Sequence, residues 1–581
     1  MCGIVGYVGY DVEQGEQQAL LQYATQLLRH RGPDQSNLFI DHFAGLGVSR
    51  LAIRDPQLGL QPMQTEDGTV IVFNGELYGI EMIRDQLIRM GYHFRTTSDT
   101  EVLLYGYLAW GDEILERITG MFAFAIWEPR RRRLLLARDR WGEKPLYIAE
   151  NAGSLIFASE AKALRLWPGV NWTIQIDDIV AFLRHGYLPD VRTGWSGVRK
   201  LLPGTKLVWE DGRISTQPYV NKPLPAELQG PEPCLESAAR ELRTLLEQAV
   251  YKCLVSDRPI GAMLSGGIDS STIVGLMSQM IGSVRTYSIR WQEMDYTEES
   301  YAREVAHQFR TAHTEILCTP DYLCANFDNI VSTFDEPFGD EGMIPMALVA
   351  EFAKKDVDVV LSGDGGDELF GGYERYHNGH PFEDYVNVYA ATRDTVMRDL
   401  LSEDIVRMNI HDQTHARYFA QVKDLELISA LRWIDLHTYL PSQVLTKVDR
   451  MTMRVALESR APFLDPAISN WALLCDPRLI STKGLPKRVL RAAVSDLLPA
   501  RILSRPKMGF GVPLVHWFRG PLRQWMDERL FHGSLWAEGW LRPEAVQRLV
   551  NEHQQMTHNH YRTLFNLLVL ESWLARQAEA V

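Results

Sequence analysis

The sequence predicts two domains of different class: an α+β N-terminal domain of stacked antiparallel sheets, and an α/β C-terminal domain with a parallel sheet and a helical cap. Three observations support this prediction. The chain has 581 residues, which is too long for a single hydrophobic core. Short runs rich in branched and aromatic residues dominate up to about residue 210. Beyond that point, helical stretches alternate with short apolar runs.

The N-terminal domain is assigned to residues 1–213. Its apolar runs, among them GTVIVFNGELY, MFAFAIWEP and SLIFASE, are separated by glycine and proline, as is typical of antiparallel strands. Four arginines at 130–133 lie between two such runs, and we expect a solvated hairpin turn there rather than a nucleic-acid patch. Residues 214–233 lack apolar periodicity and contain five prolines, which predicts a linker.

The C-terminal domain is assigned to residues 234–581. The helical stretch CLESAARELRTLLEQAVYKCL is followed by the strand-like runs PIGAML, VRTYSIR, HTEILC and VDVVLSG. Such alternation predicts a parallel sheet covered on both faces, with ligands at the carboxyl ends of its strands. Helical patterns prevail from about residue 425, which predicts that a helical cap completes the domain.

Composition narrows the class of function. The chain is 46% hydrophobic and 23% charged, an ordinary mix for a globular protein. Its formal net charge of -14 disfavours nucleic acid and anionic membrane as partners, because both are polyanions. No apolar run approaches the roughly 20 residues of a membrane helix, and the N-terminus lacks the pattern of a secretory leader. We therefore expect a cytoplasmic protein that binds small molecules, with homodimer formation left open.

Cys2 follows the initiator methionine, and a small second residue permits removal of that methionine. The new α-amine would titrate near about pH 7.7 and the thiol near about pH 8.5, so the amine is a matched base for its own thiol. One residue could then supply both nucleophile and base. If Met1 remains, the amine is blocked and we expect no such activity. An ordinary buried cysteine is the competing interpretation.

Several motifs accompany this cysteine: MCGIVGYVG at the start, HRGPD at 30–34, SRLAI at 49–53, QPM at 61–63, FNGELY at 73–78 and SDTE at 98–101. Together they resemble the class II glutamine amidotransferases, also called N-terminal nucleophile glutaminases, over roughly the first 200 residues. The resemblance implies an αββα fold of the N-terminal nucleophile (Ntn) hydrolase type and glutamine as a substrate.

The resemblance also implies roles for single residues. Cys2 would attack the glutamine amide, and Asn74 and Gly75 would form an oxyanion hole, because a side-chain amide and a backbone N–H can both donate to the developing negative charge. The glutamine-binding residues implied by the family are Arg50, Glu76 and Asp99. The competing interpretation of Asn74 and Gly75 is a type I′ hairpin turn, which this dipeptide favours.

A phosphate-binding loop is predicted at 265–270. In PIGAMLSGGIDSSTIVGLM, 259–277, an apolar strand runs into SGGIDS and then into a helical pattern. Glycines let a backbone approach phosphate, serines add donors, and a helix N-terminus favours an anion. The chain lacks GxxxxGK[ST], the loop of enzymes that transfer a γ-phosphate. The stretch resembles the loop of ATP pyrophosphatases, which implies cleavage of ATP to AMP and pyrophosphate.

A second turn, VDVVLSGDGGDELFGGYER at 357–375, supplies Asp364, Asp367 and Glu368 among glycines. We expect it to face the first loop across the nucleotide. A calcium-binding acidic loop is the alternative, although the spacing does not match an EF-hand. Farther on, RPKMGFGVP at 505–513 places Lys507 before a glycine-rich turn, where a lysine could neutralise phosphate charge. A surface lysine is the alternative there.

With DEPFGDEGMIP, VLTKVDRMTMRVALESRAPFLD and LPKRVLRAA, these motifs make the chain similar to the asparagine synthetase family over nearly its whole length. The resemblance implies ATP and Mg²⁺ as cofactors, catalytic roles for Asp364 and Lys507, and Mg²⁺ ligation by Asp269 and Asp367. Many members carry glutamate where this chain has Asp364. The implied ATP site comprises Leu264, Ser265, Gly266, Gly267, Asp269, Ser270, Ile289, Ser362 and Gly363.

The implied reaction is ATP-dependent synthesis of asparagine from aspartate and glutamine. It would pass through an aspartyl-adenylate and ammonia kept inside the protein, where it is not lost by protonation. The products would be asparagine, glutamate, AMP and pyrophosphate.

Three alternatives remain. DEGMIP departs from the DSSAIP-like form of many asparagine synthetases, so the acceptor could be another carboxylate of secondary-metabolite or polysaccharide biosynthesis. A binding protein with inactive sites is a second alternative. A tRNA-modifying ATP pyrophosphatase is the third, disfavoured by the acidic balance of the chain.

Overall fold

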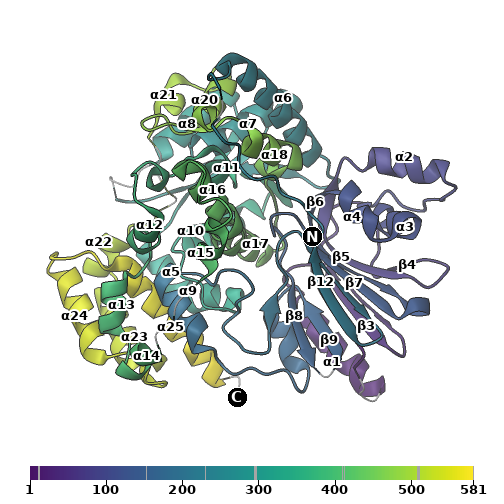
Figure 1. Ribbon diagram of the computed structural model, residues 1–581, viewed down its shortest axis with the longest axis horizontal. Helices are drawn as coiled ribbons and strands as arrows, with labels where there is room; N and C mark the ends of the chain where they lie inside the picture. The colour runs from purple at the N-terminus through teal and green to yellow at the C-terminus, as the bar shows by residue number, and fades with distance from the viewer. Residues whose placement is uncertain are drawn as a thin grey trace.

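The computed structural model describes residues 1–10, 14–151, 153–228, 230–293, 298–408, 410, 413–506, 509 and 511–579. Lys507 therefore lies outside the described residues. The N-terminal sheets pack beside the C-terminal domain, and the N-terminus lies at the boundary between them (Figure 1). The α-amine of Met1 is 3.2 Å from Oε2 of Glu458 in the C-terminal domain. The start of the chain is thus held between the two domains.

The N-terminal domain contains two six-stranded antiparallel sheets. The first has the order β10-β8-β9-β1-β3-β2 and the second β12-β11-β7-β6-β5-β4. The strands of the first sheet are β1 Cys2–Val8, β2 Gln35–Ile40, β3 Ala44–Arg50, β8 Tyr147–Asn151, β9 Ser154–Ala158 and β10 Arg199–Lys200. Those of the second are β4 Met63–Gln64, β5 Val70–Tyr78, β6 Thr119–Glu128, β7 Arg133–Arg138, β11 Thr205–Glu210 and β12 Arg213–Pro218.

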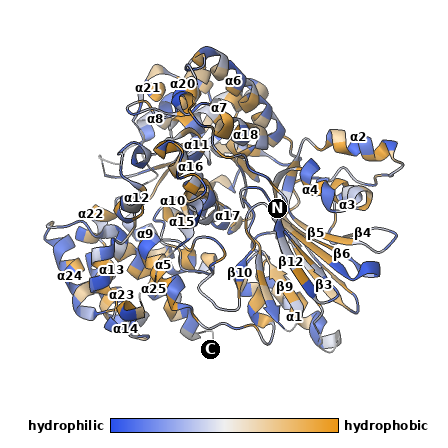
Figure 2. Cartoon of the chain, viewed as in Figure 1, coloured by the Kyte–Doolittle hydropathy of each residue, from blue (hydrophilic) through white to orange (hydrophobic). Residues whose placement is uncertain are grey.

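Alternation along β5 explains how the sheets stack. Val70 and Val72 lie in the core between the sheets, whereas Ile71 and Phe73 pack against α2 (Glu81–Arg89) and α3 (Asp99–Trp110). Successive side chains of a strand point to opposite faces, and each such buried side chain contributes about 1.5–3 kcal/mol. Helix α1 (Gln14–Leu27) covers the outer face of the first sheet. The sheet strands are accordingly largely hydrophobic (Figure 2), and the predicted αββα arrangement is confirmed.

The C-terminal domain is built on a five-stranded parallel sheet of order β15-β14-β13-β16-β17. Its strands are β13 Ile260–Met263, β14 Arg285–Arg290, β15 Ala312–Leu317, β16 Val359–Leu361 and β17 Glu458–Arg460. The four predicted strands are β13 to β16, and β17 was not predicted. The chain runs from β13 outward to β15 and then returns to the other side of β13 at β16. A ligand crevice is expected at the carboxyl ends of strands at such a reversal.

Helices surround this sheet and form the predicted cap. Those interleaved with the strands are α6 Leu235–Cys253, α7 Ile268–Ile281, α8 Glu299–Phe309, α9 Pro320–Val331, α10 Met343–Ala353 and α11 Gly366–Phe370. The cap contains α12 Phe382–Val388, α13 Asp394–Leu400, α14 Glu403–Met408, α15 Thr414–Phe419, α16 Leu427–His437, α17 Leu445–Met453, α18 Pro466–Leu474, α19 Pro477–Ile480, α20 Arg488–Ala493, α21 Ala500–Ser504, α22 Leu514–Arg519, α23 Arg523–His532, α24 Pro543–Gln554 and α25 Tyr561–Glu579. The N-terminal domain adds α4 Ile114–Arg117 and α5 Ile176–His185, and α5 packs on α25.

Two connecting segments can be compared with the sequence. The arginine run begins in a short 3-10 helix, Pro129–Arg131, passes Arg132 at φ 47° and leads from β6 into β7. The predicted solvated hairpin turn is confirmed for residues 130–132, which are exposed, whereas Arg133 is buried at the start of β7. Strand β12 extends to Pro218 and so occupies the start of the segment predicted as a linker. The boundary at residue 213 stays a prediction. Among the described residues, no helix has both the length and the apolar character needed to cross a membrane.

Candidate functional site

Cys2 is buried at the start of β1, beside the domain boundary. Its backbone N–H donates to Oδ1 of Asn74 at 2.9 Å, and Nε2 of Gln61 lies 3.9 Å from its Sγ. Burial raises the pKa of the thiol, whereas the positive charges of the chain terminus and Arg50 oppose that rise. The contacts with Asn74 and Gln61 hold Cys2 in place. Because burial favours the neutral thiol, forming the thiolate requires a base.

Asn74 and Gly75 lie in the middle of β5, where they pair with Ala123 and Phe122 of β6. The alternative prediction of a type I′ hairpin turn at this dipeptide is therefore wrong. Pairing along a nine-residue strand outweighs the local turn preference of two residues. Glycine is required by close packing, since a Cβ at position 75 would lie 2.2 Å from the carbonyl oxygen of Met121.

The side-chain amide of Asn74 has an unused donor. Its Oδ1 accepts the N–H of Cys2, while its Nδ2 is buried and has no hydrogen-bond partner within the described part of the chain. Leaving a buried donor unpaired costs about 1–3 kcal/mol, so such a donor calls for an explanation. A group bound beside Cys2 that carries negative charge on oxygen would satisfy it.

The three residues predicted to bind glutamine are all buried near this nucleophile. Arg50 pairs with Cys2 in the register of β3 and β1, and its guanidinium donates to the carbonyl oxygens of residues 54–56. Asp99 begins α3 and accepts the N–H of Leu77 at 2.9 Å. Burial raises the pKa of Glu76 to about 8, with Arg460 opposing and Asp99 adding to the rise. The structure thus brings the predicted set together.

Met1 occupies a buried position between the domains. Its α-amine donates to the carbonyl oxygen of Leu51 at 3.3 Å and to Glu458 at 3.2 Å. The nitrogen of Cys2 is then a peptide N–H, which has no basic lone pair. A base on Cys2 itself therefore requires removal of Met1, as the sequence predicts.

The second site begins at the loop between β13 and α7. Hydroxyls of Ser265 and Ser270 lie 3.1 Å apart, and the Ser265 N–H donates to Oγ of Ser270 at 3.3 Å. The Gly267 N–H donates to Oγ of Ser265 at 3.4 Å, and Gly266 has φ +74°, a left-handed conformation that favours glycine. This compact loop at a helix N-terminus has the form of a phosphate cradle.

The other predicted ATP-site residues lie at the neighbouring strand ends and line one cavity with the cradle. Leu264 follows β13, Ile289 lies near the end of β14, and Ser362 and Gly363 follow β16. The Ser362 hydroxyl donates to Oδ2 of Asp364 at 2.6 Å, and burial raises the pKa of that carboxyl. The prediction that both turns face one space is confirmed by this shared cavity.

Lys487 is a functional candidate that sequence reasoning missed. It precedes α20, and its ammonium contacts Asp269 and lies 2.6 Å from Oδ1 of Asp367. These two carboxylates come from different turns yet meet at one cation. Carboxylate oxygens are the ligands Mg²⁺ prefers, so this donor set fits the implied metal. Arg505, which donates to Glu298 and to the Ser265 carbonyl oxygen, is a further buried cation at the cavity.

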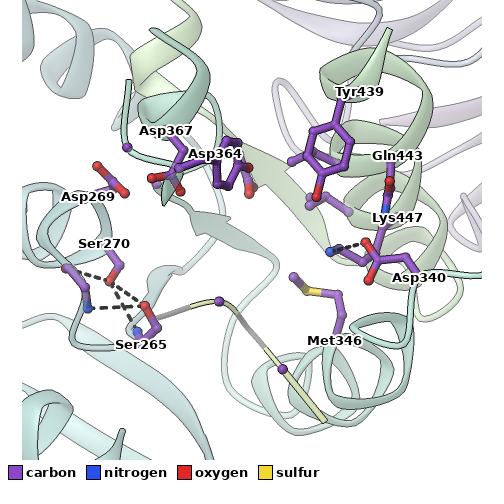
Figure 3. Close-up of a pocket in the computed structure, with 18 of the residues that line it drawn as sticks. Ser265, Asp269, Ser270, Asp340, Met346, Asp364, Asp367, Tyr439, Gln443 and Lys447 are labelled. Atoms are coloured by element: carbon purple, nitrogen blue, oxygen red, sulfur yellow. Dashed lines mark hydrogen bonds and ion pairs between the residues drawn. The ribbon is translucent and has the colours of Figure 1, made fainter. Parts of the chain in front are cut away.

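The cavity has a volume of about 610 Å³ and extends from the phosphate cradle to a second end, which we call the acceptor end because the acceptor carboxylate is expected there (Figure 3). At that end Lys447 donates to Oδ2 of Asp340 at 2.7 Å, beside Tyr439, Gln443 and Met346. Burial lowers the pKa of Lys447, but Asp340 outweighs it and raises the pKa to about 12.

Glycine at 342, within the DEGMIP segment, leaves room for this ion pair. A Cβ there would lie 2.9 Å from Oδ1 of Asp340 and 3.1 Å from Nζ of Lys447. No role for Lys447 or Asp340 was predicted from the sequence, because only the packing of α17 against the 335–345 segment brings them together.

Comparisons with known proteins agree with both halves of this arrangement. The family described as asparagine synthase matches residues 241–575, and the glutamine amidotransferase domain matches residues 1–220. Glutamine-hydrolyzing asparagine synthetase 1 of Bacillus subtilis strain 168 is 31% identical, covering 99% of this chain and 96% of its own. A putative asparagine synthetase of Mycobacterium tuberculosis H37Rv is 32% identical over 99% and 97%. Asparagine synthetase 2 of Oryza sativa subsp. japonica is 28% identical over 97% and 85%. The chain therefore belongs to the asparagine synthase family, with an N-terminal class II glutamine amidotransferase domain and a C-terminal synthetase domain.

Proposed function

We propose that this protein synthesises asparagine from aspartate, with glutamine as nitrogen donor and ATP as the source of activation. The observation that carries the proposal is the pairing of two sites in one chain. A buried cysteine lies beside an unpaired amide donor, and a neighbouring cavity combines a phosphate cradle with two carboxylates and a lysine. Relatives that match nearly the whole chain carry the same activity in their names.

In the first reaction, Sγ of Cys2 attacks the side-chain carbonyl carbon of glutamine. The carbonyl oxygen gains negative charge, which Nδ2 of Asn74 and the N–H of Gly75 stabilise. The C–N bond breaks, ammonia leaves, and water hydrolyses the thioester to glutamate. Arg50 binds the α-carboxylate, and Asp99 with Glu76 binds the α-ammonium of glutamine. Removal of Met1 supplies the amine that accepts the thiol proton.

In the second reaction, an oxygen of the acceptor carboxylate attacks the α-phosphate of ATP and pyrophosphate leaves. Enzymes of the asparagine synthase family use ATP. The 265–270 loop binds its phosphates, and Lys487 neutralises charge on the departing pyrophosphate. Bound at Asp269 and Asp367, Mg²⁺ would screen the phosphate oxygens. A raised pKa at Asp364 lessens its repulsion of the acceptor carboxylate. Lys507 stays a prediction.

Ammonia attacks the acyl-adenylate, and AMP leaves. The route between the sites is supported by a small cavity of about 10 Å³ at the domain boundary. It is lined by the 142–147 loop of the N-terminal domain and by Leu445 and Thr446 of α17. This is about the space of one water, which is enough for an ammonia molecule.

A larger carboxylate acceptor is the second candidate, favoured by the wall of the acceptor end. Tyrosines are frequent among the residues that line the cavity, and Arg375 lies 4.5 Å from one ring centroid and 4.3 Å from another. Glu341 in the DEGMIP segment also lines the cavity. Aspartate is too small to contact all of these groups. The lining tyrosines are Tyr187, Tyr287, Tyr373, Tyr385, Tyr389, Tyr439 and Tyr561.

Incubation with amide-labelled glutamine, ATP, Mg²⁺ and aspartate tests the proposal, with products measured by mass spectrometry. Labelled asparagine formed in equal amount to AMP would support it. Glutamate and ADP, or AMP without an amidated product, would contradict the assigned reaction. Glutamate formed without AMP would favour the larger acceptor, and a panel of amino-bearing carboxylates would then be screened for AMP release.

A further inference from the structure

Helix α17 carries functional side chains on opposite sides. Lys447 contacts Asp340 in the cavity, whereas Asp449 contacts Arg31 of the N-terminal domain. Residues two positions apart lie about 200° apart around a helix of 3.6 residues per turn. Arg450, one residue further on, lies 2.9 Å from Glu160 of the N-terminal domain. One helix thus contacts the acceptor end with one side and the glutaminase domain with the other.

Arg31, in the HRGPD motif, connects this helix to the nucleophile. Its Nη1 and Nη2 donate to the Asp449 carboxylate at 2.8 and 3.0 Å, and its Nε donates to the backbone carbonyl oxygen of Cys2 at 3.2 Å. Both Arg31 and Asp449 are buried. A planar guanidinium with two parallel bonds to a carboxylate has a defined orientation. Nη1 of Arg31 also donates to Oε1 of Glu160 in its own domain at 3.0 Å, so the backbone of Cys2 is held by a group that contacts both α17 and the N-terminal domain.

The start of α17 is also joined to the cavity. Residues Leu440–Val444, directly before it, form a π-helical turn, and two of them, Gln443 and Val444, line the cavity. Wide turns of this kind are rare and are frequently found at functional sites. A ligand at the acceptor end would thus contact both Lys447 and the turn that leads into the helix.

Other buried ion pairs also join the domains, for example Lys200 with Glu336 at 3.1 Å. Such pairs stabilise the interface without a bond to the nucleophile. Within the described part of the chain, neither residue of that pair has a hydrogen bond to Cys2 or Asp449. The Arg31–Asp449 pair differs because the same guanidinium contacts the residue that reacts.

We propose that Arg31 and Asp449 are positioning residues that couple glutamine cleavage to occupancy of the acceptor end. An acceptor carboxylate near Lys447 adds a second anion to the Asp340 pair and shifts α17. Arg31 carries that shift to the Cys2 carbonyl and so to the line of attack of Sγ. Misplacing a reacting atom by about 1 Å can cost about 100-fold in rate. The inference rests on the proposed function and names a regulation of its first reaction.

The test uses Asp449→Asn in the full chain. Glutamine hydrolysis is measured with and without ATP, Mg²⁺ and aspartate, and AMP formation is measured with ammonium chloride in place of glutamine. In the unsubstituted protein, ATP and aspartate together should raise hydrolysis about tenfold or more. In D449N the two hydrolysis rates should be equal, while AMP formation with ammonium stays within about twofold.

Glu336→Gln is the matched control, since it weakens a buried interdomain ion pair of the same kind and should keep the stimulation. Asp449→Glu, which keeps the charge, should restore part of it. Stimulation that persists in D449N, or is lost equally in E336Q, would overturn the proposal. Loss of ammonium-supported AMP formation in both D449N and D449E would also overturn it, because α17 would then be purely structural.

Failure of the proposed function looks different. If the unsubstituted protein forms no AMP from ammonium, ATP and aspartate, the assigned reaction fails. If it forms AMP but its rate of glutamine hydrolysis is the same with and without ATP and aspartate, the proposed coupling is wrong and the proposed reaction is retained.

Discussion

The two sites of this molecule are built in contrasting ways. The nucleophile site takes all its predicted residues from the first hundred positions, on three strands and one helix start of one sandwich: Cys2, Arg50, Asn74, Gly75, Glu76 and Asp99. The cavity of the second site is lined by residues between His185 and Arg562, and so draws on both domains and the last helix. A compact site can therefore be recognised from short motifs, whereas the larger one depends on how distant segments pack.

The difference extends to electrostatics. Around Cys2, buried acids have raised pKa values because burial dominates. Between the domains, opposite charges are matched, and the Arg31 guanidinium holds the pKa of Asp449 below its usual range despite burial. The first arrangement suits groups that bind a charged ligand, and the second suits a permanent contact between the two domains. The two sites should accordingly fail separately when each is changed.

Removing the nucleophile should give the largest effect. Cys2→Ala should lower glutamine-dependent amidation by about a thousandfold or more, because no other group forms the thioester. Amidation supported by ammonium chloride should be unchanged. Both rates are measured as AMP release. Cys234→Ala, at an exposed cysteine, is the control and should alter neither rate. Equal loss of both activities in C2A would show that the sites are not separable.

The reverse experiment changes Lys487. Lys487→Met should lower AMP formation about 100- to 1,000-fold with either nitrogen source, since a cation aimed at developing phosphate charge is lost. Basal glutamine hydrolysis, measured without ATP, should persist. Lys483→Met, at an exposed lysine of the same segment, serves as control. If K487M lost only glutamine-dependent synthesis, Lys487 would act in the coupling between the two sites and not in ATP cleavage.

The role of Lys487 could not be predicted from the sequence. The motif LPKRVLRAA was assigned to the family, but its lysine received no role. Its place beside Asp269 and Asp367 results from packing of α20 against two other segments, which no local pattern encodes. The 265–270 loop, in contrast, was predicted because strand, glycine-rich loop and helix follow one another directly in the chain.

Strand β17 was missed for a related reason. It is three residues long and contains Glu458 and Arg460, residue types that are depleted from buried strands. Here each charge has a partner: Arg460 lies 2.7 Å from Glu458 and 3.5 Å from Glu76, and Glu458 accepts from the chain terminus. Two of these partners, Glu76 and the chain terminus, lie hundreds of residues away in the sequence, and such tertiary ion pairs outweigh the unfavourable local propensity. The stacked antiparallel sheets needed no such information, since short apolar runs separated by glycine and proline predict them.

A smaller effect is expected at the acceptor end. Gly342→Ala places a methyl group against both members of the Asp340–Lys447 pair, and overpacking of this kind costs about 1–3 kcal/mol. The KM for the acceptor should rise about tenfold, corresponding to ~1.4 kcal/mol, with KM for ATP unchanged. Gly15→Ala, where a Cβ meets no atom within 4 Å, is the control. An unchanged KM for the acceptor would show that the Asp340–Lys447 pair does not contribute to acceptor binding.

The smallest effect concerns the pH dependence of glutamine binding. Burial raises the pKa of Glu76 to about 8, although Arg460 opposes the rise, so the carboxyl is mostly protonated at pH 7 and gains charge as pH increases. A charged Glu76 attracts the α-ammonium of glutamine more strongly, so KM for glutamine should fall a few-fold, about three to ten times, between pH 7 and 8.5. In Glu76→Gln the KM should be higher and should not change over this range. The measurement is steady-state glutaminase kinetics, with ammonium-supported AMP release as a check that the second site is intact. A slope that persists in E76Q would assign the titration to another group, with Cys2 and Asp99 as the neighbours whose pKa values are also raised.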